Sequence, residues 1–414
     1  MLSVLSGWAL YNTPILVAGV RHLRRSGQKE KKFSSFGKKR LPMVSIIVPV
    51  KDEEKVVGRL LDAFLNLDYP SEKREVVIVE DGSVDKTVEV CTEYARRYPD
   101  QVKLVRRSVS DGKPSALNYG LKHARGEIVA VFDADNVPEP DVLYNVARRF
   151  EDSSIVAVQG RTDSINSDEN MLTRFVSYEE AVRFETYIRG KDMLGLFVPI
   201  TGSCYFIRKN VLLDVGGWDN ECLSEDMEMA LRLTKRGYKI KYAPEVRSWQ
   251  ENPVSLVQLI RQRTRWFRGD MEMALKYGKL MTKPNRRNVD AEMTLAGPFL
   301  FILCLVSYFL GPLAFLSSFQ SEMVFVILTQ VTLAITLVPL FILGAALIYV
   351  ARPWRVANLL WLPFIYAYWS LQTLLASFAF LQIVFRRPKK WTKTVKTGTA
   401  ANRDFKERIQ SRVV

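Results

Sequence analysis

The feature that most constrains this chain is a short apolar run, Ile128 to Phe132, which ends at two carboxylates in the spacing Asp133-x-Asp135. An uninterrupted apolar run of this length is typical of a strand buried on both faces of a parallel sheet. Ligands of open α/β sheets bind beyond the carboxyl ends of the strands, so we expect both carboxylates in a binding site. Their oxygen atoms suit Mn²⁺ or Mg²⁺ held together with substrate phosphates. The alternative is an Asp-rich turn, and the spacing alone does not decide between the two.

The segments on either side of this run alternate between strand patterns and helix patterns. This βαβ series predicts an α/β fold with a mostly parallel sheet and helices on both of its faces. No G-x-G-x-x-G and no G-x-x-x-x-G-K-S/T sequence follows the first strand, which disfavours dinucleotide-binding enzymes and P-loop NTPases. The predicted strands are 44–50, 75–79, 102–106, 128–132 and 155–159, and the predicted helices include 53–67, 85–97 and 114–124.

Uncharged stretches long enough to cross a bilayer lie on both sides of the α/β region. Residues 1–20 carry no charge and precede Arg21, Arg24 and Arg25, which predicts an N-terminal transmembrane helix with the downstream chain in the cytoplasm. A cleaved signal peptide would carry its positive charge before the apolar region instead. Toward the C-terminus, 294–320, 323–350 and 356–385 are each long enough to span.

The net charge of +15 is concentrated in two short segments. Residues 21–40 carry nine Lys or Arg against one Glu, and residues 386–414 carry ten against two acids. Both segments flank long uncharged stretches, which indicates cytoplasmic segments beside a membrane and argues against nucleic acid as a partner. If the α/β region and the basic tail are both cytoplasmic, the chain between them must cross the membrane an even number of times. We therefore predict two transmembrane helices in 291–350 and an interfacial or re-entrant segment in 351–385, three spans in total, with four as the alternative.

Cysteine and histidine usage argues against several kinds of site. The four cysteines form no Cys-x-x-Cys pair, which indicates neither a disulfide framework nor a zinc site. Two histidines are too few for a histidine-based metal centre, so we expect carboxylates to carry the chemistry.

Six motifs follow one another in the order of a known family. They are VSIIVPVKDEE (44–54), VIVEDGSVDKT (77–87), DGKPSALNYGL (111–121), VFDADN (131–136), Ser224-Glu225-Asp226 and QRTRW (262–266). Together they resemble the membrane-bound branch of glycosyltransferase family 2, which contains cellulose, chitin and hyaluronan synthases and ceramide glucosyltransferase. The resemblance implies a GT-A nucleotide-sugar-binding domain over 44–250. The composition before it predicts a basic linker over 21–43, and the amphipathic, aromatic pattern after it predicts interfacial helices over 251–290, which include the last motif.

The resemblance also assigns the residues that bind the donor. Asp133 and Asp135 would hold Mn²⁺ or Mg²⁺, which stabilises the leaving diphosphate as a Lewis acid. Without the family context, Lys113 would equally be a solvated lysine in a loop. Lys51 stands where the family commonly has an aromatic and Glu80 where Asp is common, which leaves uracil and guanine both open. The donor residues are Pro49, Val50, Asp52, Glu53, Asp81, Lys113, Asp133, Asp135 and Arg265.

Asp226 is the predicted general base. In an inverting transfer the acceptor hydroxyl attacks the sugar C1, and a carboxylate within hydrogen-bond reach takes its proton. The alternative for Asp226 is a charge that stabilises a helix N-terminus, because a helical pattern begins at this motif. The residues expected at the acceptor are Thr201, Gly202, Ser203, Glu225, Gln262 and Trp266, although Gly202 also fits a plain turn and Trp266 a core position.

The C-terminal segment 386–414 is predicted to be a cytoplasmic tail. Its sequence around Trp391 and Thr394 resembles the loop that closes over the nucleotide in these synthases. We therefore expect a gating role for this tail.

Taken together, the sequence predicts a metal-dependent, inverting hexosyltransferase of the cell membrane, with its catalytic domain in the cytoplasm. The donor is a UDP- or GDP-sugar carrying glucose, N-acetylglucosamine or mannose. Because few spans form only a partial channel, a lipid-linked acceptor, such as a polyprenyl-phosphate glycan intermediate or a glycolipid, is favoured over a saccharide. The alternatives are a processive polysaccharide synthase and a non-catalytic nucleotide-binding membrane protein. The expected partners are thus the donor, the acceptor and membrane lipid.

Overall fold

The computed structural model describes residues 2–26, 41–278, 284–315, 323–350, 360, 362–389, 394 and 396–398. Its contacts divide the chain into two compact units. One is an α/β unit formed by Ser34–Ser177, Val198–Gln258 and Lys393–Val414, and the other is a helical unit formed by Met1–Phe33, Tyr178–Phe197 and Leu259–Thr392.

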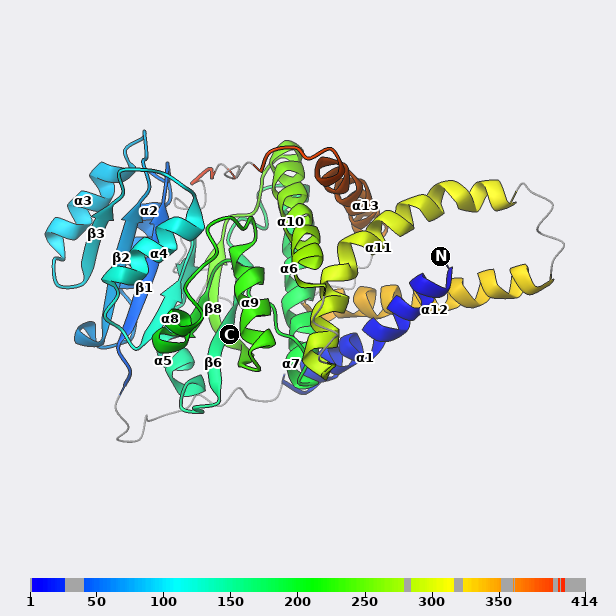
Figure 1. Ribbon diagram of the computed structural model, residues 1–414, viewed down its shortest axis with the longest axis horizontal. Coiled ribbons are helices and arrows are strands. Elements are labelled where there is room, and N and C mark those ends of the chain that lie inside the picture. The colour runs from blue at the N-terminus through cyan, green and yellow to red at the C-terminus, as the bar shows by residue number, and fades with distance from the viewer. Residues whose placement is uncertain are drawn as a thin grey trace. The chain divides into compact units, whose positions relative to one another are not determined.

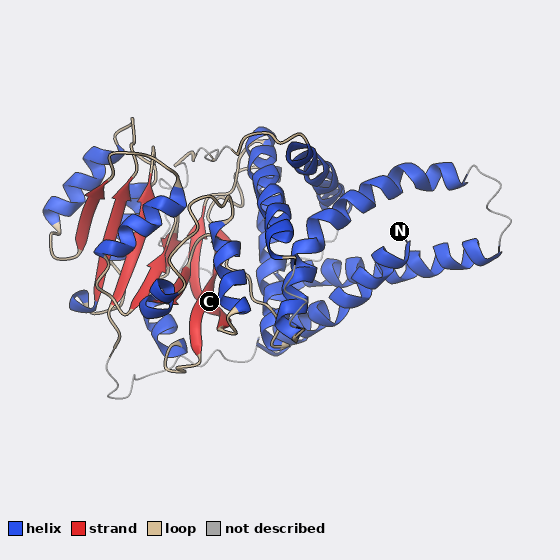
Figure 2. Cartoon of the chain, viewed as in Figure 1, coloured by secondary structure: helices blue, strands red, loops and turns tan. Residues whose placement is uncertain are grey.

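The α/β unit is built on one eight-stranded sheet (Figures 1 and 2). Its strands lie in the order β3 (Val102–Arg106), β2 (Arg74–Glu80), β1 (Val44–Val50), β4 (Ile128–Val131), β7 (Tyr205–Arg208), β6 (Ile155–Ser164), β8 (Lys239–Gln250) and β5 (Val137–Pro138).

The first four strands in this order are parallel, and β7 runs antiparallel between β4 and β6. Strands β6 and β8 are again parallel, and β5 pairs antiparallel with β8. The chain order reverses at β1, which pairs with β2 on one side and with β4 on the other. A reversal of this kind opens a crevice at the carboxyl ends of the two strands, which is where ligands of such sheets bind.

Apolar side chains cover both faces of the parallel part of the sheet. Every residue of β2 and β4 is buried, as expected of strands with helices on both faces. The helices of this unit include α2 (Val57–Leu65), α3 (Thr87–Arg97), α4 (Lys113–His123), α5 (Val142–Arg149), α8 (Lys209–Asp214) and α9 (Glu225–Lys235).

The predicted α/β class and the predicted strands are confirmed. The predicted strands 44–50 and 102–106 agree with β1 and β3, and β2 and β4 differ from their predictions by one residue at the ends. Strand β6 begins where predicted, at Ile155, but continues five residues past the predicted end to Ser164. The sequence patterns did not identify β5, β7 or β8. Strand β7 is only four residues long, and β8 alternates between buried and partly exposed residues over twelve, so neither presents a continuous apolar run.

The helical unit contains α1 (Leu2–Ser26), most of α10 (Leu256–Tyr277), α11 (Arg286–Phe315), α12 (Met323–Val350) and α13 (Leu362–Val384). The π-helical η2 (Arg183–Ile188) and α7 (Arg189–Met193) continue α6 (Met171–Val182) and contact α1. Glycine makes this contact close: a Cβ added at Gly19 would collide with the Thr186 backbone, and one added at Gly190 with the Ile15 backbone.

A buried ion pair joins three segments of the helical unit. The Lys191 ammonium lies 2.9 Å from the Asp290 carboxylate, and both side chains are almost completely buried, at 0% and 1% exposed. Asp290 also accepts hydrogen bonds from the Tyr11 hydroxyl and from the Phe197 backbone N–H. The Lys191 ammonium also donates to the Thr294 hydroxyl at 2.5 Å, so both charged groups have partners inside the protein, as burial requires.

Among the described residues, three helical stretches are long and apolar enough to cross a membrane: Ser3–His22, Arg286–Leu310 and Pro363–Val384. The first agrees with the predicted N-terminal span, and the second begins the region predicted to hold two. Length and composition do not fix depth in a bilayer. The prediction of an interfacial or re-entrant segment at 351–385 therefore stays a prediction, as do the total number of spans and the predicted domain boundaries.

Candidate active site

The two carboxylates that follow β4 lie at the edge of the sheet where the chain order reverses. The backbone N–H of Asp133 donates a hydrogen bond to the Ser203 hydroxyl at 3.0 Å, which ties this loop to the segment before β7. The Asp133 side chain is 37% exposed, whereas the Asp135 side chain is only 6% exposed. One carboxylate is thus open to a ligand, while the other is enclosed.

Lys113, the first residue of α4, connects the predicted donor and acceptor residues. Its ammonium lies 2.7 Å from Asp133 and 3.2 Å from Glu225, and it donates a hydrogen bond to the Gly202 carbonyl at 2.8 Å. Burial lowers the pKa of Lys113, but the two carboxylates outweigh it and raise that pKa above the ordinary value. The ammonium therefore stays charged, and the solvated-lysine alternative does not describe this environment.

Asp226 lies in the first turn of α9, next to the buried Glu225. Burial and the neighbouring Glu225 raise the pKa of Asp226 from 3.8 to about 6, while Lys113 opposes this shift. A carboxyl group with a pKa near the working pH is suited to accept a proton and release it again. The position at a helix N-terminus and a role as a base are therefore compatible.

Gly202 keeps the space in front of Asp226 open. Its φ is +76°, a conformation that other residues rarely adopt. A Cβ at this position would lie 3.3 Å from Asp226 Oδ2 and 3.9 Å from Lys113 Nζ. The glycine thus gives a substrate close access to the carboxylate, beyond what a plain turn needs.

The residues flanking Gly202 are held by a glutamine that the sequence patterns did not single out. Gln159 on β6 accepts a hydrogen bond from the Thr201 N–H at 2.9 Å and donates one to the Ser203 carbonyl at 3.1 Å. A buried side-chain amide that spans two backbone groups fixes the course of a loop. No pattern in the sequence distinguishes this glutamine from an ordinary strand residue.

The predicted nucleotide residues lie at the carboxyl ends of β1 and β2. Pro49 and Val50 are the last residues of β1, and the Asp81 N–H donates to the Val50 carbonyl at 3.0 Å. Asp52 has a φ of +54°, and its carboxylate accepts a hydrogen bond from the Val84 N–H at 2.8 Å. The Glu53 N–H donates to the Thr87 hydroxyl at 2.7 Å, so the loop after β1 is joined to the start of α3.

Asp81 has a partner that sequence reasoning missed. The Arg107 guanidinium lies 2.5 Å from one carboxylate oxygen, and the Ser110 hydroxyl donates to the other at 2.8 Å. Burial raises the pKa of Asp81, against the opposing effect of these two neighbours. Arg107 directly follows β3, so its position at the end of a predicted strand was the only available signal.

Gln262, Arg265 and Trp266 lie on α10, in the part of the chain that belongs to the helical unit. The Arg263 guanidinium stacks over the Trp266 ring at 4.3 Å from its centroid and pairs with Glu179 at 2.8 Å. One face of this ring is therefore occupied. The predicted roles of Gln262, Arg265 and Trp266 toward the donor and the acceptor stay predictions.

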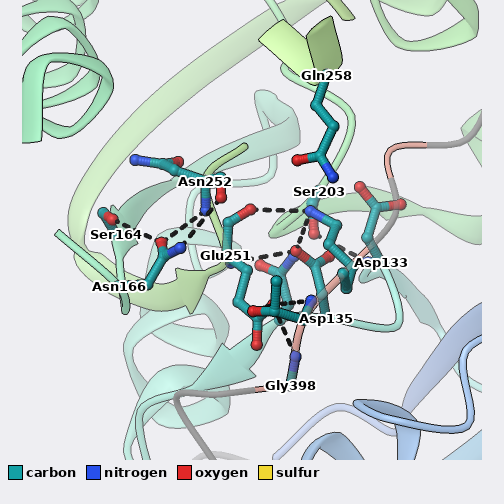
Figure 3. Close-up of polar contacts among 12 residues, drawn as sticks. Asp133, Asp135, Ser164, Asn166, Ser203, Glu251, Asn252, Gln258 and Gly398 are labelled. Atoms are coloured by element: carbon teal, nitrogen blue, oxygen red, sulfur yellow. Dashed lines mark hydrogen bonds and ion pairs between the residues drawn. The ribbon is translucent and has the colours of Figure 1, made fainter. Parts of the chain in front are cut away.

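Part of the C-terminal tail contacts the second carboxylate. Lys396 lies 2.6 Å from Asp135, and the backbone N–H groups of Thr397 and Gly398 donate to Glu251 (Figure 3). Burial raises the pKa of Asp135, but Lys396 and Arg59 outweigh it and hold that pKa below its ordinary value. Of the two predicted tail residues, Thr394 is described but Trp391 lies outside the described residues.

The pair Asp133 and Asp135 fits a hard divalent cation. Each carboxylate attracts an ammonium group, Lys113 at 2.7 Å and Lys396 at 2.6 Å, so the pair already favours positive charge. Within the described ranges, no third His, Cys, Asp or Glu completes a metal-ligating group. Two carboxylates complemented by phosphate oxygens and water are an arrangement that Mg²⁺ and similar ions accept.

Comparison with known proteins identifies a family for the part of the chain that contains these residues. A model of the family described as "Glycosyltransferase like family 2" matches residues 42–269. A Bacillus subtilis protein named "Probable glycosyltransferase YdaM" is 32% identical over 315 residues, which are 75% of this chain and 73% of that relative.

Two further groups of relatives have names that state the product of the enzyme. The "Beta-monoglucosyldiacylglycerol synthase" of Nostoc sp. is 35% identical over 59% of this chain, and the "Poly-beta-1,6-N-acetyl-D-glucosamine synthase" of Staphylococcus epidermidis is 30% identical over 56%. The chain spans only about half the length of each, 52% and 56%.

Among solved structures, the mannosyltransferase PcManGT from Pyrobaculum calidifontis, in complex with GDP-Man and Mn²⁺, aligns with a TM-score of 0.58 and 22% identity. The alignment covers 93% of this chain and 100% of that one. At this identity the likeness establishes the GT-A-like fold alone.

Proposed function

Because the chain belongs to the family of glycosyltransferase like family 2 proteins, we propose that it is an inverting, metal-dependent hexosyltransferase that uses a UDP- or GDP-sugar and a lipid-linked acceptor. The observation that carries this proposal is the grouping around Lys113, whose ammonium contacts Asp133, Glu225 and the Gly202 carbonyl. It joins the carboxylate expected at the diphosphate to the segment expected at the acceptor.

In the proposed reaction the acceptor hydroxyl attacks C1 of the donor sugar while Asp226 takes its proton. The new bond forms between the acceptor oxygen and C1, and the bond between C1 and the diphosphate oxygen breaks. The nucleoside diphosphate leaves with the bonding electron pair. Attack from the side opposite to the leaving group inverts the configuration at C1.

Lys113 and the pair Asp133 and Asp135 would act on the leaving group. The charged ammonium of Lys113, which lies beside Asp133, would bind a diphosphate oxygen. A divalent cation held by the two carboxylates would supply Lewis-acid stabilisation of the diphosphate. Asp81, with Arg107 beside it, is proposed to recognise the nucleobase by accepting a hydrogen bond from a base N–H group on its carboxylate.

The lipid acceptor is supported by the candidate membrane helices and by the similarity to the Nostoc protein, whose printed name is that of a glucosyldiacylglycerol synthase. An enzyme anchored in the membrane meets its lipid acceptor in two dimensions, without a channel for a growing polymer. We place the catalytic unit in the cytoplasm of a cell-membrane protein, on the basis of the arginines after the N-terminal span.

A processive polysaccharide synthase is the second candidate, because the Staphylococcus epidermidis relative has the name of a polymer synthase. The two candidates differ in what happens to the product. A polymerase keeps its product and extends it, whereas a lipid glycosyltransferase releases a lipid with one sugar or a few sugars added.

The test is nucleotide release by the detergent-purified chain with a panel of UDP- and GDP-sugars. Each donor is tested with Mn²⁺, with Mg²⁺ or with chelator, and with or without diacylglycerol or polyprenyl-phosphate lipid. Metal-dependent release that rises with one lipid, and a product in the organic phase, support the lipid transferase. A growing water-soluble product without a lipid requirement supports the polymerase instead.

Asp226→Asn separates catalysis from a non-catalytic binding protein. This variant should lose release with each donor but keep donor binding by calorimetry, and Glu221→Gln, an exposed position shortly before α9, is the matched control. Full release by a folded Asp226→Asn protein would rule out the proposed base. If the wild-type chain neither binds nor turns over any donor, the enzyme proposal fails.

A further inference from the structure

Residues 396–398, named here the docked tail, place a cation on Asp135 of the carboxylate pair. Lys396 Nζ lies 2.6 Å from Asp135 Oδ2 and donates a second hydrogen bond to the Glu251 carbonyl at 2.9 Å. An ammonium at this distance occupies a place where a divalent cation would approach the same oxygen. The same oxygen also accepts a hydrogen bond from the Glu251 backbone N–H at 3.2 Å, so both of its lone pairs are used and a divalent cation can bind it only after Lys396 leaves.

Glu251 holds the tail in this position. Its side chain is almost fully buried, and its carboxylate accepts hydrogen bonds from the Thr397 N–H at 3.1 Å and the Gly398 N–H at 3.3 Å. Arg59 donates to the other carboxylate oxygen at 3.0 Å and to the Asp135 carbonyl at 3.1 Å. Figure 3 shows Glu251 between Asp135 and Gly398 in this network.

Gly398 makes the tail position specific. Its φ is +69°, and a Cβ there would lie 2.9 Å from the Lys55 carbonyl oxygen and 3.0 Å from the Lys55 Cβ. The carbonyl belongs to the backbone of the loop after β1 and has little freedom to move aside. The docked position of the tail therefore requires a glycine at position 398.

We propose that the docked tail is an internal competitor of the divalent cation, with Lys396 as the cation surrogate on Asp135 and Glu251 as the residue that holds it there. The inference rests on the proposed metal-dependent function and deepens it. Release of the tail becomes a precondition for metal binding at Asp135, so the affinity for the metal depends on how firmly Glu251 holds the tail. Lys113 contacts the other carboxylate, Asp133, and belongs to α4, so release of the tail does not move it.

Competition between the docked tail and the metal predicts changes in metal affinity that a change in local charge alone would not produce. Gly398→Ala changes no charge but obstructs the docked tail, so it should tighten Mn²⁺ binding on the order of tenfold if the docked state dominates by that factor. Glu251→Gln removes a negative charge beside the site, which by charge alone would weaken cation binding. Because it also releases the tail, the competition predicts tighter binding for this variant as well.

The experiment is Mn²⁺ titration followed by electron paramagnetic resonance, with the full chain in detergent and without donor. The matched control is Gly237→Ala, which introduces the same residue at a φ of +83° where no atom lies within 4 Å of the added Cβ. Tighter binding in Gly398→Ala and Glu251→Gln, with the control unchanged, supports the competition. Unchanged or weaker binding in both variants overturns it while leaving a metal-dependent transferase intact. If neither the wild-type chain nor any of the variants binds Mn²⁺, with or without donor, the competition and the proposed metal dependence fail together.

Discussion

The ionisation of Asp226 should be visible in the pH dependence of the reaction. Burial and Glu225 raise the pKa of this carboxyl from 3.8 to about 6. A general base works only when deprotonated, so activity should rise with pH. With a pKa of about 6, roughly one molecule in ten carries the ionised base at pH 5 and roughly nine in ten at pH 7, a change of about tenfold.

The assay is kcat/KM for nucleotide release between pH 4.5 and about 8, the range over which such a base titrates. Glu225→Gln removes one of the two causes of the raised pKa. The rise of kcat/KM on the acidic side of this variant's pH profile should therefore occur at lower pH than in the wild type. Because neighbouring carboxyl groups titrate together, the measured midpoint belongs to the cluster as well as to Asp226. A wild-type rate that stays constant from pH 5 to about 7, or a limb that Glu225→Gln leaves in place, would refute the assignment.

Three further outcomes test other parts of the structure. Lys191→Met leaves the buried carboxylate of Asp290 without its counter-charge and should cost about 3–5 kcal/mol of folding free energy, measured as a lower thermal midpoint in detergent, whereas the exposed Lys103→Met should change it little. Gly202→Val should abolish transfer while preserving the circular dichroism spectrum, since its side chain would lie against Asp226 at a strained φ. Removal of divalent ions by chelation should stop nucleotide release, and added Mn²⁺ should restore it; release that persists in chelator would contradict the metal requirement.

The central strands and the polar residues at their ends were predictable from sequence. The strand run before Asp133 is continuous and apolar, and the segment before Pro49 is apolar except for Ser45, because both are buried on both faces, so the pattern needs no tertiary context. Parallel strands place their carboxyl ends at one edge of the sheet, and the residues after them were thereby expected together.

The partners of those residues were not predictable. Arg107 meets Asp81 because β2 and β3 are neighbours, and Gln159 spans Thr201 and Ser203 because β6 pairs with β7. These contacts join residues about 26 to 44 positions apart in the chain. A local pattern carries no record of such pairings, because strand order is a property of the whole sheet.

The sequence by itself determined the α/β class, the apolar segments and the residue types available for chemistry, because periodicity, charge and motif order are local properties. Only the tertiary structure decided that Lys113 joins Asp133 to Glu225, and that Lys396 from the tail reaches Asp135, 261 positions before it. The physical reason is that burial makes an unpaired charge costly, and the enclosed carboxylates of Glu225 and Asp135 are stabilised by a cation that the fold brings to them. Which lysine that is depends on the path of the whole chain.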